Sequence, residues 1–392
     1  MSPAKPAREV RCDPDLDPEW VGQLRRELGA WYDRGHRDLP WRADRDPYRI
    51  LVSETMLVQT TVAAVVPYFE RFLARFPTVQ ALAVADEAEV LKAWEGLGYY
   101  RRARQLHQAA QAIVRHHGGL VPEDPEALRA LPGVGRYIAG AILSFAFDRP
   151  APIVEANTQR VLARLLAWPH DLKTAASQTR LWQAAERLVD PERPGRFNQA
   201  LMELGATLCA VRAPMCLACP VARHCQARAQ GRQDALPISS AKAPPRGVVE
   251  ACALVERAGR LLIVQRGPGR LWEGFWEFPT VHVAGADPAG RALGGDRPIN
   301  LAEGVRRLTG VVATIGPAVK TLRFGVTNHR VTLTAYAATA TGGTLAPGPG
   351  LVRVAWERPA DLGRLVFGSA QRRLATWVSG ATQGPPAEGR GR

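Results

Sequence analysis

Residues 50–61, ILVSETMLVQTT, place a carboxylate where a helix would bury its side chains. At helical spacing, one apolar stripe of this segment contains Ile50, Leu51, Glu54, Leu57 and Val58. Two interpretations of Glu54 are open. It is a helix-end residue or the partner of a buried arginine, or it is a carboxyl in an apolar pocket. In such a pocket, burial raises the pKa of the carboxyl and makes it a proton donor near neutral pH.

Four cysteines lie close together with the spacing C-x6-C-x2-C-x5-C: Cys209, Cys216, Cys219 and Cys225. Four thiolates at this spacing indicate a metal or a cluster. Structural zinc is one alternative, but zinc sites usually carry two C-x2-C pairs and this loop has one. A single [4Fe–4S] cluster fits the spacing better, because it accepts four cysteines from one compact loop.

The heptapeptide LPGVGRY at 131–137 joins a short helical turn to an apolar helix. Two glycines around an apolar residue favour a tight hairpin whose backbone N–H groups point outward at a helix N-terminus. A plain helix–helix turn is one interpretation. The other is an anion site for a DNA phosphate, formed by Gly133, Val134, Gly135 and Arg136, without base specificity.

The composition favours a polyanionic partner. Lys+Arg 51 against Asp+Glu 37 gives a formal net charge of +14, and 46% of the residues are hydrophobic, which is enough for sizeable cores. The first ten residues are polar and contain proline, and the longest apolar run, 137–147, is too short to cross a bilayer. We therefore expect no membrane association and a cytoplasmic location.

Two domains are expected to position these residues. The predicted divisions are a disordered tail over 1–14, an all-α domain over 15–230 that includes the cysteine loop 209–225, a Pro- and Ser-rich linker over 231–247, a smaller α+β domain over 248–380 and a disordered tail over 381–392. Apolar periodicity predicts helices over 47–65 and 68–75, among others. A hairpin around AGR at 258–260 and a strand over 330–340 are predicted in the second domain.

The order of the motifs resembles the helix-hairpin-helix DNA glycosylase superfamily with an iron–sulfur loop, and more closely its adenine DNA glycosylase (MutY) family. The matching segments are RDLPWR at 37–42, SETMLVQT at 53–60, YFERFLARFPTV at 68–79, GLGYYRRAR at 96–104, LPGVGRY at 131–137 and FNQALMELGA at 197–206. The segment GRLWEGFWEFP at 269–279 resembles the MutT-like C-terminal domain of that family. The resemblance implies an all-α helix-hairpin-helix glycosylase domain with a [4Fe–4S] cluster loop, followed by a smaller α+β Nudix-like domain.

The function that the resemblance implies is monofunctional DNA glycosylase activity in base excision repair. The enzyme would hydrolyse the N-glycosidic bond of adenine mispaired with 8-oxoguanine or guanine in double-stranded DNA. The resemblance also implies a monomer with one cluster, acting in the nucleoid of a bacterial cytoplasm. Three alternatives remain: a related iron–sulfur glycosylase for another mispair such as T:G, an endonuclease III-like glycosylase/lyase, and an iron–sulfur DNA-binding protein without catalysis.

By the resemblance, Glu54 is the acid that protonates the adenine ring in a reaction with an oxocarbenium-like transition state. Such a reaction needs a second carboxylate, which the family supplies as the aspartate of a D-G-N triplet. This chain has Glu155, Ala156 and Asn157 there, so Glu155 is a departure whose carboxylate reaches one methylene further. An N-cap role for Glu155, before a helix near Thr158, is the alternative.

Other site residues follow from the same motif matches. The base pocket would be lined by Arg37, Leu39, Trp41, Arg42 and Glu203. Gln59 and Tyr99 would wedge into the duplex after the adenine is flipped from the stack. Val58 replaces the first of two successive glutamines in the family, which weakens the expected contacts to the opposite strand.

The distinction from a lyase rests on one position. Endonuclease III-type enzymes form a Schiff base through a lysine directly after LPGVGR, where this chain has Tyr137. Only Lys92 and Lys173 lie inside the predicted catalytic domain, and neither belongs to a matched motif. We therefore expect no lyase step, with Tyr137 and Asn157 as further members of the catalytic site.

The second domain invites a different function, hydrolysis of nucleoside diphosphate derivatives. The metal-binding helix of Nudix enzymes reads R-E-x-x-E-E-x-G, and the aligned positions here hold Glu303, Gly304, Arg307 and Leu308. The metal carboxylates are missing, so the usual Mg²⁺ site cannot form. By resemblance the domain reads the lesion through the loop aligned with F-S-H, here Val326, Thr327 and Asn328, of which Thr327 and Asn328 are the predicted contacts.

Overall fold

The computed structural model describes residues 16–238, 240, 244–269, 271–285 and 301–381. The chain divides into two compact units, one of Met1–Val90 with Arg101–Ala241 and one of Leu91–Tyr100 with Lys242–Arg392. The predicted tails, 1–14 and 382–392, lie outside the described residues. No helix of the described residues is long and apolar enough to cross a membrane.

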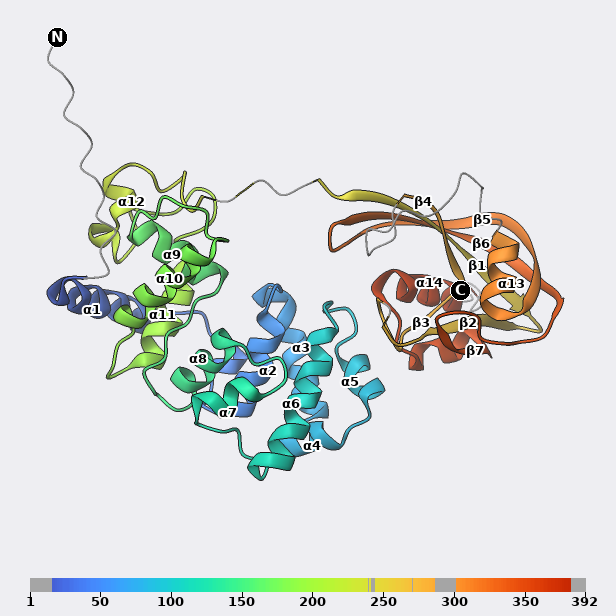
Figure 1. Cartoon of the computed structure of the whole chain (residues 1–392), viewed down its shortest axis with the longest axis horizontal. Coiled ribbons are helices and arrows are strands. Elements are labelled where there is room, and N and C mark those ends of the chain that lie inside the picture. Colours follow the sequence, from blue (N-terminus) through green and yellow to red (C-terminus); the bar gives the residue numbers. More distant parts are fainter. Residues whose placement is uncertain (1–15, 239, 241–243, 270, 286–300, 382–392) are drawn as a thin grey trace, which may run out of the picture. The chain divides into compact units, whose positions relative to one another are not determined.

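The first unit is helical, as predicted (Figure 1). Its helices, with α5 continuing into the second unit, are α1 Pro18–Arg34, α2 Pro47–Leu57, α3 Val62–Arg75, α4 Val79–Val84, α5 Glu87–Ala93, α6 Arg101–His117, α7 Pro125–Ala130, α8 Arg136–Phe145, α9 Ala156–Leu165, α10 Ala175–Leu188, α11 Pro194–Thr207 and α12 Gln226–Ala229. Short 3-10 turns lie at η1 Pro40–Arg42 and η2 Ala222–His224. Helices α1, α9, α10 and α11 share one apolar core, which includes Leu24, Leu162, Leu181 and Leu201.

The break between the second and third helices differs from the prediction. We expected helices over 47–65 and 68–75, but α2 ends at Leu57, and α3 runs through Pro67. Gln59 has a left-handed backbone with φ 59°, which ends the helical path before α3 begins. The cause is distant in sequence: the Arg102 guanidinium of α6 donates to the carbonyl oxygens of Thr55 (3.1 Å) and Met56 (2.8 Å). These carbonyls have lost their helical partners, and the cation satisfies them.

The second unit is built on a mixed sheet. Its elements are β1 Arg246–Arg257, β2 Arg260–Arg266, β3 Trp276–Glu277, β4 Thr280–Gly285, α13 Leu301–Thr309, β5 Val311–Val326, β6 His329–Gly343, β7 Leu351–Glu357, η3 Pro359–Arg364 and α14 Ser369–Ala381. The strand order is β3-β2-β1-β6-β5, while β4 pairs with β1 and β7 with β2. Strands β1 and β6 are parallel, and the other pairs are antiparallel. The predicted β1–β2 hairpin and the predicted strand over 330–340 are both present.

Two apolar layers cover the sheet, one on each face. Alternate side chains of β1 face opposite ways. Cys252 and Leu254 belong to the layer that contains residues of η3 and α14, such as Leu362 and Leu374. Ala253 and Val255 belong to the other layer, which α13 covers.

Candidate active site and cluster loop

Glu54 lies in α2 with 2% of its surface exposed. Burial raises the pKa of its carboxyl to about 7, and the nearby negative charge of Glu155 raises it further. Two groups act in the opposite direction: Tyr137, whose hydroxyl donates to Oε2 of Glu54, and the cation of Arg42. The carboxyl is therefore close to half protonated at neutral pH, which suits a general acid.

Tyr137 and Glu54 are 83 residues apart in sequence, and the hairpin before α8 brings them together. Tyr137 stands in the first turn of α8, directly after the LPGVGR segment. Burial raises the pKa of its phenol, and the charges of Glu54 and Glu155 add to this effect. Tyr137 therefore stays protonated and acts as a hydrogen-bond donor to Glu54.

Glu155 is the N-cap residue of α9. Its carboxylate accepts from the backbone N–H groups of Asn157 and Thr158, each at 2.8 Å, and the Glu155 N–H donates to Oγ1 of Thr158 at 2.8 Å. These contacts form a capping box. Burial raises the pKa of Glu155, while the two backbone donors lower it. The N-cap alternative thus describes the contacts of Glu155, and its charge also acts on the buried Glu54.

Glu203 joins the arginines predicted for the base pocket. Arg37 donates from Nε to Oε1 of Glu203 at 2.7 Å, and Arg42 donates from Nη2 to Oε2 at 2.9 Å. Burial opposes ionisation of this carboxyl, but the two guanidinium groups outweigh burial and hold the pKa of Glu203 below its ordinary value. Leu39 and Trp41 are buried, and the Trp41 ring packs edge-on against Phe69 at 5.5 Å between centroids.

The glycine hairpin has the backbone that its sequence predicts. Gly133 has φ 78°, and a Cβ there would lie 2.7 Å from Cβ of Gln105, so only glycine fits. Gly135 is the N-cap of α8 and supplies no side-chain acceptor. Val134 is buried, and Arg136 places its guanidinium 4.0 Å from the centroid of the Trp182 ring.

The two predicted wedge residues both have left-handed backbones, with φ 59° at Gln59 and φ 49° at Tyr99. Tyr99 is 54% exposed. It belongs to the Leu91–Tyr100 segment of the second unit, whereas Gln59 belongs to the first. Such a backbone is uncommon outside glycine and asparagine and marks a specialised position.

The four cysteines line one cavity together with Arg164 and Arg228. Burial raises the pKa of Cys219 to about 11, and the neighbouring thiolates contribute in the same direction. Within the described chain, no three His, Cys, Asp or Glu side chains are arranged to hold a single metal ion. A four-iron cluster makes a different demand, because each of its four irons takes one thiolate. Four cysteines around one cavity fit that demand.

Two arginines of α9 that the sequence analysis did not single out support this loop. Arg164 is 2% exposed and donates to Sγ of Cys209 at 3.2 Å and to the carbonyl oxygen of Leu236 at 2.9 Å. Arg160 donates to the carbonyl oxygen of Cys209 at 2.8 Å and to Oδ1 of Asn157 at 2.9 Å. Asn157 in turn donates from Nδ2 to Glu155 at 3.3 Å. A signal was present, since two arginines four residues apart lie on one face of α9.

Comparison with known proteins identifies the two units. Residues 52–187 match the family described as "HhH-GPD superfamily base excision DNA repair protein", and residues 251–377 match the "NUDIX domain" family. An adenine DNA glycosylase of Mycolicibacterium smegmatis is 43% identical over 207 residues, which cover 52% of this chain and 69% of that protein. The chain belongs to the adenine DNA glycosylase family.

Two further relatives of this adenine DNA glycosylase family member define the extent of the match. The adenine DNA glycosylase of Rattus norvegicus is 41% identical over 323 residues, covering 69% of this chain and 62% of the relative. This chain therefore spans less than two thirds of that protein's length. The solved structure of a thermostable thymine-DNA glycosylase matches with a TM-score of 0.50 and 29% identity, covering 55% of this chain and all of that one. The predicted fold class is confirmed.

In the Nudix-like unit of this family member, the predicted lesion loop is the tight turn between β5 and β6. Thr327 has φ 50°, and its hydroxyl donates to the carbonyl oxygen of Val326 at 2.8 Å. Thr327 and Asn328 are exposed, whereas His329 is 7% exposed. Glu303 is the only carboxylate of α13, at the position where Nudix enzymes have arginine.

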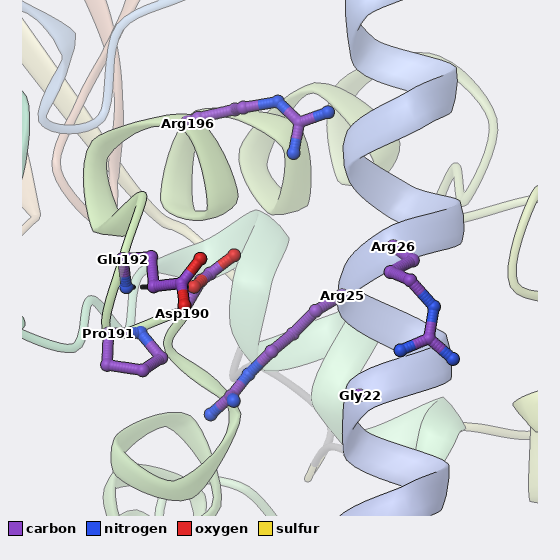
Figure 2. A pocket seen from close by; sticks show the side chains of 7 residues that line it. All are labelled: Gly22, Arg25, Arg26, Asp190, Pro191, Glu192 and Arg196. Atoms are coloured by element: carbon purple, nitrogen blue, oxygen red, sulfur yellow. Dashed lines mark hydrogen bonds between the residues drawn. The ribbon is translucent and has the colours of Figure 1, made fainter.

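A separate hollow of about 230 Å³ lies between α1 and the segment joining α10 to α11. Figure 2 shows three arginines and two carboxylates around it: Arg25, Arg26, Arg196, Asp190 and Glu192. Arg25 donates to the carbonyl oxygens of Leu188 (3.1 Å) and Val189 (2.8 Å), and Arg196 donates to Asp33. These arginines hold helices together, and none of the predicted site residues lines the hollow.

Proposed function

We propose that this chain is a monofunctional DNA glycosylase that hydrolyses the N-glycosidic bond of adenine, mispaired with 8-oxoguanine or guanine, in double-stranded DNA. The observation that carries the proposal is the buried Glu54 carboxyl, whose pKa is about 7 and which lies beside Tyr137 and the charge of Glu155. The names of the relatives support adenine as the base. We retain 15–230 and 248–380 as the limits of the two domains.

In the proposed mechanism, Glu54 donates its proton to a ring nitrogen of the flipped adenine. The base then leaves as a neutral molecule, and positive charge develops on the sugar. Glu155 stabilises that charge, because its carboxylate is held in one orientation by two backbone N–H groups of α9. Tyr137 orients Glu54 through its hydroxyl. Water completes the hydrolysis at the sugar carbon.

No protein amine is available for a covalent step near these groups among the described residues. Position 137 holds tyrosine where a lyase would have lysine. Lys92 donates to Glu95 at 2.6 Å, and Lys173 donates to Ser240 at 3.2 Å. The proposed product is therefore an abasic site in an intact strand.

The remaining sites have supporting roles in the proposal. A [4Fe–4S] cluster held by the four cysteines would stabilise the loop, with Arg164 bonded to one of its ligands. Gly133, Val134, Gly135 and Arg136 would hold a DNA phosphate, Gln59 and Tyr99 would occupy the space left by the flipped base, and Thr327 and Asn328 would contact the opposite base. We propose a monomer that acts in a bacterial nucleoid.

The test is an excision assay with duplexes carrying A:8-oxoguanine, A:G, T:G or an oxidised pyrimidine, with alkali added afterwards. Release of adenine opposite 8-oxoguanine, with strand cleavage only after alkali, is the expected result. The match to a thymine-DNA glycosylase structure makes T:G the competing substrate. Preferential release of thymine would favour that candidate, and binding without release would indicate a DNA-binding protein without catalysis.

A further inference from the structure

We infer that an uncovered part of the sheet in the second unit binds the sugar–phosphate backbone of DNA, an inference that rests on DNA being the partner under the proposed function. The surface lies at the end of the face that α13 covers elsewhere. Ala253 and Val255 of β1 pack in the α13 layer, whereas Val249, on the same face, is 41% exposed. Figure 1 shows β1, β5 and β6 continuing together beyond α13.

The strand register places three rows of side chains on this surface. They are Gly247, Arg330 and Gly325, then Val249, Thr332 and Arg323, then Ala251, Thr334 and Thr321. We call these nine residues the β1–β6–β5 platform. It contains two arginines, three threonines and two glycines, and none of its nine positions is acidic.

Arg330 stands between two positions without side chains. A Cβ added at Gly247 would meet nothing within 4 Å, and one added at Gly325 would meet only the His329 carbonyl oxygen, at 3.9 Å. Glycine in the middle of a sheet costs stability and often marks a place where another backbone approaches. The space on both sides of the Arg330 stem is therefore open to a polymer lying on the sheet.

The two arginines are close to each other and exposed. Arg323 is opposite Thr332, and Arg330 is opposite Gly325, which makes the arginines diagonal neighbours, roughly 7–8 Å apart between their backbones. Two like charges at this spacing repel each other, and an anion between them would remove the repulsion. Guanidinium groups and hydroxyls are the donors that DNA phosphates accept most often.

The flatness of the surface also suits a polymer more than a small ligand. Thr321 and Thr334 share a hydrogen bond between hydroxyl oxygens 3.3 Å apart, so one face of the sheet carries a row of donors without a deep hollow. The same hairpin ends in Thr327 and Asn328, so a duplex lying on the platform would run past the turn proposed to contact the lesion.

The test measures the salt dependence of binding to a fluorescent duplex of ordinary paired sequence. The full-length double variant Arg323→Gln/Arg330→Gln is compared with the native chain and with Arg257→Gln/Arg260→Gln. The control removes the same charge from exposed residues at the β1–β2 turn, at the other end of β1.

Each lost phosphate contact should lower the slope of log Kd against log salt by about 0.9. The platform variant should therefore lose about 2 from the slope, which corresponds to about tenfold less weakening of binding over a fourfold rise in salt. The control should keep the native slope. An unchanged slope in the platform variant, or an equal loss in the control, would overturn the inference. Adenine release by the native chain is measured separately, so an inactive native chain with a platform-specific slope change would refute the proposed activity and leave the platform standing.

Discussion

Replacing Glu54 by glutamine should make the protein more stable at alkaline pH while it loses activity. Glutamine keeps the shape of the side chain and can still accept a hydrogen bond from Tyr137. What it removes is the ionised form in a site with 2% exposure. A catalytic carboxyl in an apolar pocket destabilises the fold once it is ionised, so the substitution removes that penalty.

The size of the effect follows from the pKa of Glu54, which burial raises from 4.5 to about 7. Because the folded chain holds this proton more tightly than the unfolded chain, the contribution to stability is complete below pH 4.5 and is lost as the pH rises through 7. At about 1.4 kcal/mol per pH unit, the loss amounts to about 3 kcal/mol. Glu54→Gln should thus exceed the native chain in stability by about 3 kcal/mol at pH 8.5, and by much less at pH 5.

Urea unfolding at pH 5, 7 and 8.5 measures this difference, with Glu203→Gln as the matched control. Glu203 is also buried, but its two arginine partners lower its pKa, so its contribution is present at neutral pH and is lost in acid. That control should be less stable than the native chain at pH 7 and 8.5. A Glu54→Gln variant that is no more stable than the native chain at pH 8.5 would refute the buried-acid interpretation.

The remaining predictions concern the chemistry and the cluster. Single-turnover adenine release should fall as the pH rises through about 7, since Glu54 loses the proton that it donates; a flat profile from pH 6 to 8.5 would exclude Glu54 as the acid. Glu155→Gln should slow release by roughly a hundredfold or more with DNA affinity retained, and Glu155→Asp should show whether the longer side chain is needed; native-like release by Glu155→Gln would remove its stabilising role. Cys216→Ser should lose the iron and the visible absorption band, and stoichiometric zinc without iron in the native chain would contradict the cluster. Borohydride should trap little covalent complex, whereas efficient trapping would reveal an amine in the site.

The parts of the site that sequence predicted best are those encoded locally. The cysteine spacing predicted one shared site, and the four side chains do line one cavity. The glycines of LPGVGRY predicted a tight hairpin, and φ 78° at Gly133 agrees with it. The apolar stripe around Glu54 predicted burial, which the structure confirms.

The parts that could not be predicted depend on side chains far apart in the sequence. The end of α2 is determined by Arg102, about 45 residues away. The link from Cys209 to Glu155 depends on Arg160 contacting two loops at once. The grouping of Leu91–Tyr100 with the second unit has no local signal either, because short helices carry no mark of the unit they pack in.

The Arg102 contacts at the end of α2 have a mechanical consequence. The same guanidinium that accepts no helix partner of its own donates to Met56 and, at 3.1 Å, to the hydroxyl of Thr60. It therefore clamps the last turn of α2 to the short segment that carries Gln59. Glu54 lies one turn before this clamp and Gln59 just beyond its first contacts, so the two side chains ride on one stiff lever. Any load that a base stack places on Gln59 is transmitted to the proton donor, and the resistance of the duplex to being opened is felt where the proton is delivered.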